Sequence, residues 1–190
     1  MFIAGHNRDD ISLLTFISKT PLPDDFLFGV ANSGYQVEGG YNRPGFPHNN
    51  FSEWENIGRF ELTGDACHFW DRHDEHIELA RSLGLKSFRL SIEWARIQPS
   101  YHARVSPPPA VDESAVRGYA SIISKIMDSG MTPIVTLHHF THPAWCGLDF
   151  WLQEGMAGLF VGYAADMVLR INEYLMEQGK KPLMLLVLPM

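Results

Sequence analysis

The chain has 190 residues, of which 45% are hydrophobic and 19% charged, a balance typical of one globular domain and unlike that of a disordered protein. Acidic residues outnumber basic ones by 22 to 15, which argues against the basic face that a nucleic-acid partner requires. No apolar run approaches the roughly 20 residues of a membrane span, so we expect a cytoplasmic protein without membrane contact. Cys67 and Cys146 lack a zinc-ligand spacing, and we expect two free thiols rather than a disulfide.

Residues 1–22 are predicted to form a leader, and residues 23–190 a single domain in which apolar runs alternate with helical periods. A long polar loop covers about residues 32–64. Strands are predicted over residues 26–31, 86–94, 132–139 and 182–190. Helices are predicted over residues 69–83, 114–129 and 159–175, with Asp112 near the start of the second helix and Gly84 and Gly130 at helix ends.

Strands that alternate with helices indicate a parallel sheet covered by helices, in either a doubly wound sheet or a barrel. The first strand-to-helix turn lacks the GxGxxG spacing of a dinucleotide site. A long first loop and polar groups at successive strand ends favour a barrel, whose active site lies at the C-terminal ends of its strands. The predicted fold class is therefore α/β, an incomplete (β/α)8 TIM barrel with about the first three to four βα units.

Polar side chains follow one face of the second predicted strand. Because side chains alternate along a strand, the face that carries Arg89 and Glu93 would point into a barrel, and the apolar face would meet the helices. An arginine inside a barrel needs a carboxylate or an oxygen-rich ligand. Two interpretations stay open: an Arg89–Glu93 pair, or an arginine that orients a carboxylate supplied by another strand.

Histidines gather after the third predicted strand, and a metal site is one hypothesis. His138 and His139 point to opposite faces of a strand, so only His139 with His142 remains as a pair there. A second cluster, near the first helix, comprises His68, His73 and His76. Neither set offers four ligands at a standard spacing, so we expect no metal and no cofactor. A single histidine at a strand end instead suits a hydrogen bond to a ligand hydroxyl.

The first loop contains Gln36, whose amide both donates and accepts and therefore suits a pair of hydroxyls. Three motifs around these candidates resemble those of family 1 glycoside hydrolases, the β-glucosidase and phospho-β-glycosidase group. They are FGVANSGYQVEG at residues 28–39, FRLSIEWARIQP at residues 88–99 after Gly64-Asp65, and PIVTLHHFTHP at residues 133–143. The resemblance runs from about residue 23 to about residue 175, and the order of the motifs makes it more specific than any one of them.

The resemblance implies a retaining β-glycosidase that acts on the O-glycosidic bond of a β-linked sugar or glycoside. Gln36 and His139 match residues that hydrogen-bond sugar hydroxyls, and Arg89 matches an arginine beside the nucleophilic glutamate. Trp94 matches a structural tryptophan. The chain departs from the family pattern at His76, Phe140, Thr141 and His142.

Retaining glycosidases need two carboxylates about 5 to 5.5 Å apart. The resemblance implies an acid/base in an Asn-Glu-Pro motif after the fourth strand and a nucleophile on the seventh. No Asn-Glu-Pro occurs in this sequence, and Asn172-Glu173 lies within the third predicted helix. Other acidic residues near the site show no pairing: Glu38, Glu53, Glu55 and Glu93. We therefore assign no catalytic residue.

Three or four βα units leave sheet edges and apolar faces uncovered, so we expect poor stability alone, self-association, or a complementing C-terminal fragment. The first interpretation is a truncated β-glycosidase that is inactive alone. The alternatives are one half of a split enzyme and a non-catalytic sugar-binding or assembly module.

Overall fold

The computed structural model describes residues 22–41, 47–100, 106–183 and 186–187. Four strands form one parallel sheet in the order β1 (Gly29–Ala31), β2 (Ser87–Ser91), β3 (Thr132–Thr136) and β4 (Leu186–Val187). Each strand is the spatial neighbour of the next strand along the chain, as in a barrel that closes only after more strands are added. The chain thus forms an incomplete (β/α)8 barrel, as the sequence predicts.

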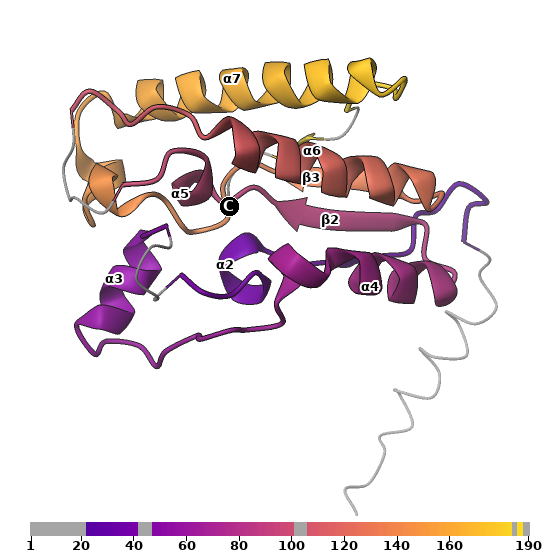
Figure 1. The fold of residues 1–190 in the computed structure, drawn as a ribbon, viewed down its shortest axis with the longest axis horizontal. Helices are drawn as coiled ribbons and strands as arrows, with labels where there is room; N and C mark the ends of the chain where they lie inside the picture. The colour runs from indigo at the N-terminus through magenta and orange to yellow at the C-terminus, as the bar shows by residue number, and fades with distance from the viewer. Residues whose placement is uncertain (1–21, 42–46, 101–105, 184–185, 188–190) are drawn as a thin grey trace, which may run out of the picture.

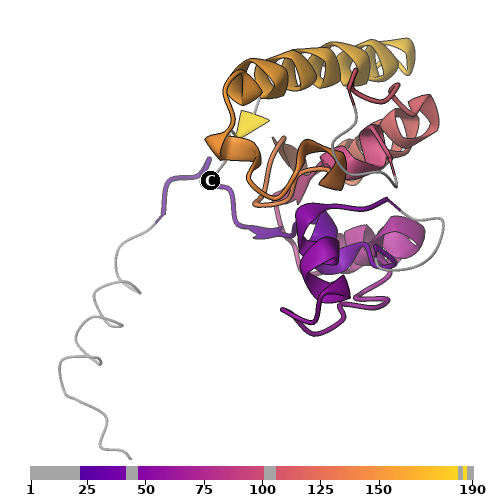
Figure 2. The ribbon, with the colours of Figure 1, turned by 90° about the vertical axis from the view of Figure 1, so that its left-hand side faces the viewer.

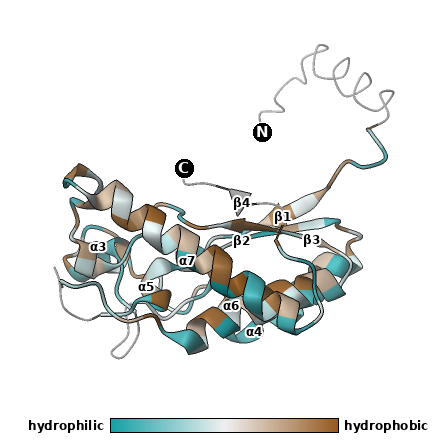
Figure 3. Ribbon diagram, turned by 90° about the horizontal axis from the view of Figure 1, so that it is seen from above, coloured by the Kyte–Doolittle hydropathy of each residue, from teal (hydrophilic) through white to brown (hydrophobic). Residues whose placement is uncertain are grey.

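Three long helices connect the strands: α4 (Phe69–Ser82), α6 (Glu113–Asp128) and α7 (Met156–Glu177). Figure 1 labels the three helices, with α4 below β2 and α6 and α7 above it, and the view from above in Figure 3 shows them together on one side of the sheet. Helix α6 begins where the Asp112 carboxylate accepts from the backbone N–H groups of Ser114 and Ala115, and Gly130, at φ 76°, follows its end. Because the helices cover only one face of the sheet, the opposite face can form a barrel interior.

Apolar side chains of β2 pack under these helices. Phe88 stacks on Phe69 of α4 at 6.0 Å between ring centroids, and Leu90 and Ile92 are buried in the same core. The predicted division of this strand into an apolar and a polar face is therefore correct. Trp94 lies in the core as well, stacked on Tyr163 of α7 at 4.4 Å, which confirms its structural role.

Glycine is required where β1 meets β2. A Cβ atom at Gly29 would lie 2.0 Å from the Ser87 hydroxyl oxygen and 2.3 Å from the Ser87 carbonyl oxygen. Any side chain at this position would push the two strands apart, because neither distance is sterically accessible. Gly29 thus sets the pairing that begins the sheet.

The strands are shorter than the sequence predicts. Strand β2 ends at Ser91 instead of Trp94, because Glu93 caps a short helix, α5 (Trp94–Ile97), by accepting from the backbone N–H of Ala95 at 3.5 Å. Strand β3 ends at Thr136 instead of His139. Apolar runs extend past the paired residues because the turns after each strand are buried too. The predicted fourth strand contains β4, of which the structure describes Leu186–Val187.

The polar loops contain further short elements that the sequence analysis did not predict. They are helices α2 (Gly34–Val37) and α3 (Asn50–Asn56) and the 3₁₀ turns η1 (Ala144–Cys146) and η2 (Phe150–Leu152). All four follow the C-terminal end of a strand. Each is too short to show a helical period, so hydrophobic patterning does not reveal it.

Both cysteines are free, as expected. Within the described ranges, none of the helices is long and apolar enough to cross a bilayer. The predicted leader lies outside the described residues except for its last position, Leu22.

Candidate functional site

The C-terminal ends of the strands face the viewer in Figure 2 and carry the loops that contain Gln36 and His139. Helix α2 is tied to this end of the sheet, because the backbone N–H of Gly34 donates to the Ser91 hydroxyl at 2.6 Å. The turn after β3 is tied to α3 through Asn50, whose side chain donates to the Phe140 carbonyl and accepts from the backbone N–H of His142. The candidate site therefore rests on loops that are fixed to the sheet.

Arg89 on β2 and His139 after β3 come close enough to interact electrostatically. The pKa of His139 is lowered, first by burial and then by the positive charge of Arg89, so the imidazole is neutral near pH 7. Nε of Arg89 and Nδ1 of His139 are buried without a hydrogen-bond partner in the described part of the chain. The two residues thus present a cation and a neutral imidazole, each with unused hydrogen-bonding capacity.

Gln36 lies on α2 with an exposed side chain, and its Oε1 accepts from the Ser33 hydroxyl at 2.6 Å. This bond leaves the two N–H donors of the amide free for a ligand. No hydrogen bond in the described ranges joins Gln36 to Arg89 or His139. The structure brings Arg89 and His139 together and places Gln36 on a neighbouring loop at the same end of the sheet.

Glu93 does not pair with Arg89, so that sequence interpretation is wrong for the described structure. Its carboxylate instead accepts from the Thr141 hydroxyl at 2.7 Å and is only 2% exposed. Burial, the largest cause, raises the pKa of Glu93 to about 7, and the nearby charge of Glu38 adds to the effect. Thr141 departs from the family pattern, and its contact joins the end of β2 to the turn that carries His139.

Phe140 adopts φ 67°, a backbone conformation that is uncommon for residues other than glycine, and its ring is exposed. This left-handed residue directly follows His139. It turns the chain sharply where β3 ends, and the bonds of Asn50 and Thr141 on either side hold the turn in place. Local strain of this kind is often found at functional sites.

Glu38 lies in a buried polar network beside the candidate site. Its carboxylate accepts from Arg96 Nε at 2.9 Å, from the Tyr119 hydroxyl at 2.6 Å and from the Tyr41 hydroxyl. The Arg96 guanidinium lies over the Trp70 ring, 4.0 Å from its centroid. This network joins the first loop to α4, α5 and α6, so the Glu38 carboxylate has a structural role. The sequence analysis missed it, because the bonds that link Arg96 and Tyr119 to the first loop join residues 55 to 81 positions apart along the chain.

The remaining acidic candidates also make structural contacts. Glu55 on α3 accepts from the backbone N–H of Thr63 at 2.7 Å and from the Tyr35 hydroxyl. Glu53 lies 3.2 Å from Nδ1 of His48. Each acidic residue singled out from the sequence is therefore engaged by other protein groups.

The histidine clusters do not converge on one point. His142 stacks on Phe150, and its Nε2 contacts the Gly147 carbonyl oxygen at 3.0 Å. His138 packs against other rings, those of Trp151 and Phe160. In the portion of the chain that the structure describes, no three His, Cys, Asp or Glu side chains form a group that could hold a metal ion.

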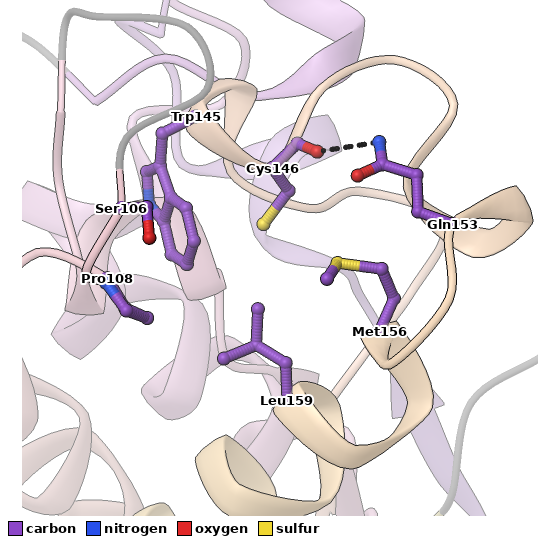
Figure 4. Close-up of a pocket in the computed structure, with 7 residues that line it drawn as sticks. All are labelled: Ser106, Pro108, Trp145, Cys146, Gln153, Met156 and Leu159. Atoms are coloured by element: carbon purple, nitrogen blue, oxygen red, sulfur yellow. Dashed lines mark hydrogen bonds between the residues drawn. The ribbon is translucent and has the colours of Figure 1, made fainter.

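A hollow of about 360 Å³ opens between η1 and the start of α7 (Figure 4). Its lining is mainly apolar and comprises Ser106, Pro108, Trp145, Cys146, Gln153, Met156 and Leu159. Burial raises the pKa of the Cys146 thiol to about 12, so this cysteine is not a reactive thiolate near neutral pH. None of Gln36, Arg89 and His139 lines the hollow, which is therefore separate from the candidate site.

The parallel βα units define a protein of the TIM-barrel class. Its polar candidate site, with an arginine on one strand and a neutral histidine after the next, lies at the C-terminal ends of the strands, where TIM-barrel active sites are found. Residues 18–175 match the family model Glycosyl hydrolase family 1. The chain belongs to this family, and the resemblance found in the sequence is confirmed.

Two curated relatives illustrate the similarity. Beta-glucosidase 7 of Arabidopsis thaliana is 31% identical over 156 residues, which cover 80% of this chain and 30% of that protein. Lactase/phlorizin hydrolase of Rattus norvegicus is 35% identical over 150 residues, or 74% of this chain and 7% of that protein. The chain thus spans less than a third of the length of these relatives.

Solved structures agree with this assignment. The family 1 β-glucosidase from Thermotoga maritima aligns with a TM-score of 0.73 and 26% identity over 88% of this chain and 36% of that one. The β-glycosidase from Pyrococcus horikoshii aligns with a TM-score of 0.67 and 31% identity over 88% of this chain and 35% of that one. The fold is thus that of one part of a family 1 barrel.

Proposed function

We propose that this chain forms the sugar-binding part of a retaining β-glycosidase site and supplies neither of its two catalytic carboxylates. Gln36 and His139 hydrogen-bond hydroxyls of the sugar, and Arg89 stands ready to orient a nucleophilic carboxylate. The observation that carries this proposal is that Arg89 on β2 and His139 after the adjacent strand β3 each keep a buried nitrogen without a partner among the described residues. A sugar hydroxyl beside His139 and a carboxylate beside Arg89 would satisfy these nitrogens.

Two observations, one from the sequence and one from the contacts of its acidic residues, support the proposal that the chain supplies no catalytic carboxylate. No Asn-Glu-Pro motif occurs, and Glu38 and Glu55 are engaged in buried hydrogen bonds. Glu93 stands apart as a carboxyl whose pKa is raised, but it is buried against Thr141. Hydrolysis by this route therefore requires carboxylates from a further part of the barrel, so the 190-residue chain alone is inactive.

A binding titration tests the sugar site. Methyl β-D-glucoside is added to the purified chain, and the affinity is measured by isothermal titration calorimetry in the wild type and in each variant, while the imidazole resonances of His139 are followed by NMR in the wild type. We expect saturable shifts, with binding weakened at least tenfold in Gln36→Ala and in His139→Ala. The half-buried His76 on α4, whose Nε2 contacts the Cys67 carbonyl oxygen, provides a control outside the proposed sugar site, because His76→Ala should leave the binding unchanged. Unaltered binding in both site variants would overturn the subsite assignment.

An activity measurement tests the second half of the proposal. The chain alone should release no p-nitrophenol from p-nitrophenyl β-D-glucoside above the uncatalysed rate. Turnover by the pure chain would show that it holds its own catalytic groups, and the missing-carboxylate proposal would then be wrong.

A non-catalytic sugar-binding module is the second candidate. One relative, 34% identical over 150 residues, is itself named Probable inactive beta-glucosidase 14, of Oryza sativa. This candidate predicts glucoside binding by a folded monomer, and no gain of hydrolysis when further barrel units are added.

A further inference from the structure

Glu93 contacts both segments that carry the proposed sugar-binding residues. Its Oε2 accepts from the hydroxyl of Thr141 at 2.7 Å, and Thr141 lies two residues after His139 in the turn that follows β3. Its Cβ packs against α2, where a Cβ atom at Gly34 would lie only 3.1 Å away, and Gly34 lies two residues before Gln36. Glu93 therefore connects the helix of Gln36 to the turn of His139.

The backbone around Glu93 is held in place, so its carboxyl has a fixed origin. The Glu93 N–H donates to the Tyr119 hydroxyl of α6 at 3.0 Å, and Oε1 accepts from the Ala95 N–H at 3.5 Å. Helix α2 is bound to the same strand end, because the Gly34 N–H donates to the Ser91 hydroxyl at 2.6 Å. A change at the Glu93 carboxyl is therefore transmitted to the turn after β3 rather than to the sheet.

The first loop joins this arrangement at Asn49. Residues 48–50 and 142–144 run antiparallel, with a bridge between Asn49 and Pro143 that backbone hydrogen bonds of 2.9 and 3.0 Å flank. Asn49 is fully buried beside Glu93, and its Nδ2 has no hydrogen-bond partner in the residues that the structure describes. The Glu93 carboxyl thus lies where the first loop, α2 and the turn after β3 meet, next to an amide that can still donate.

The charges around Glu93 do not favour its ionised form. Burial, the largest cause, and the carboxylate of Glu38 raise the pKa of Glu93 to about 7, although the bond from Thr141 opposes the shift. Arg96, the cation beside Glu38, is already paired with it at 2.9 Å. Arg89 shares the strand face of Glu93 but does not pair with it. An ionised Glu93 is therefore a buried charge that no cation among the described residues pairs with.

The other titratable groups near Glu93 are uncharged at neutral pH. Burial is the first cause that raises the pKa of the nearby phenols, which are Tyr35 on α2, Tyr41 in the first loop, Tyr119 on α6 and Tyr163 on α7. In the turn after β3, burial lowers the pKa of His139 and His142. Near pH 7, Glu93 is therefore the group among these whose charge changes.

We propose that Glu93 is a positioning residue of the sugar site: its protonated carboxyl holds α2 and the turn after β3 at the separation that suits Gln36 and His139, and release of its proton to solvent weakens sugar binding. A buried charge needs more donors than Thr141 and Ala95 supply, so the carboxylate draws in water and the Asn49 amide, and the turn that packs on Glu93 shifts. This inference rests on the proposed function and adds a residue that contacts no ligand itself, because Glu93 is only 2% exposed.

The first measurement needs no sugar. The imidazole resonances of His139 are followed by NMR in the full 190-residue chain as the pH is raised from 5.5 to 8.5. We expect an inflection near pH 7 that reports the ionisation of Glu93 and disappears in Glu93→Gln, whose amide keeps the shape of the protonated carboxyl. Glu154→Gln, at an exposed position in the loop before α7, gives the matched control and should keep the inflection.

The second measurement is the affinity for methyl β-D-glucoside, determined by isothermal titration calorimetry at pH 6 and pH 8.5. A group with a pKa of about 7 is mostly protonated at the lower pH and mostly ionised at the higher, so wild-type binding should weaken by about fivefold or more between them. Glu93→Gln should bind equally at both pH values, close to the wild type at pH 6. Glu93→Ala should bind weakly at both, and Thr141→Val, which removes only the hydroxyl, should share this loss.

Rescue by glutamine but not by alanine separates positioning from general destabilisation, and circular dichroism checks that each variant is folded at the assay temperature. Wild-type affinity in Glu93→Ala, or equal wild-type affinity at both pH values, would overturn the inference. So would an inflection of His139 that persists in Glu93→Gln. If the wild type binds no glucoside at either pH, but its His139 inflection is lost in Glu93→Gln, the proposed function is refuted and the link between Glu93 and the turn stands.

Discussion

The buried carboxyl of Glu93 predicts a specific dependence of stability on pH. Burial raises its pKa from 4.5 to about 7 in the folded chain. The folded state therefore holds the proton more tightly than the unfolded state does. The stabilisation is fully present below pH 4.5 and is lost as the pH rises through 7, and it amounts to about 3 kcal/mol.

The variant Glu93→Gln isolates this contribution, because its amide oxygen still accepts from Thr141 but does not titrate. Free energies of unfolding in urea are measured for both proteins at pH 4.5 and pH 8. We expect the variant to gain about 3 kcal/mol relative to the wild type between the two pH values. His138 and His142, whose pKa values are lowered to about 4 by burial, change stability in the opposite direction, but they cancel in the difference between the two proteins.

The control is Glu154→Gln, at an exposed position, which should show the same difference from the wild type at both pH values. A 13C titration of the Glu93 side-chain carboxyl provides an independent reading of its pKa. A pH-independent difference for Glu93→Gln, together with a titration near pH 4.5, would refute the reasoning that burial controls this group.

Two further predictions concern stability. Arg96→Met leaves the buried Glu38 carboxylate without its cation, so the free energy of unfolding in urea should fall by about 3 to 5 kcal/mol. The double variant Arg96→Met/Glu38→Gln should recover part of this loss, and a single variant as stable as the wild type would contradict the structural role of the ion pair. Gly29→Ala places a Cβ atom 2.3 Å from the Ser87 carbonyl oxygen and should lower the melting temperature. Gly158→Ala, with open space around its Cβ in α7, should not lower it, and equal behaviour of the two glycine variants would contradict the close approach.

The long elements of the fold were predictable from the sequence because their patterns are strong. The apolar period from Val116 to Ile126 places α6, and Asp112 and Gly130 mark its ends within one or two residues. The ends of the strands were not predictable in the same way. Glu93 reads as one more alternating strand residue, and only its bond to Ala95 shows that it starts a helix.

The candidate site was partly predictable. The unusual arginine on β2 pointed to the barrel interior, and the structure places Arg89 near His139. The partner of Glu93 was not predictable, since Thr141 lies 48 residues further along the chain and carries no local signal, and of the two interpretations left open the Arg89–Glu93 pair is not found. Long-range polar partners of this kind depend on the three-dimensional arrangement of loops, which hydrophobic periodicity does not describe.

The buried network of Glu38 also affects how the loop after β1, which contains Gln36, can change during evolution. Gln36 is exposed, but it lies between Tyr35, which bonds Glu55, and Glu38, which bonds Arg96. The neighbours hold the backbone of the loop, and the glutamine side chain contributes little to folding. In the proposed sugar-binding role of Gln36, substitutions at position 36 would change the hydrogen bonds to the ligand at small cost in stability and without a compensating change elsewhere.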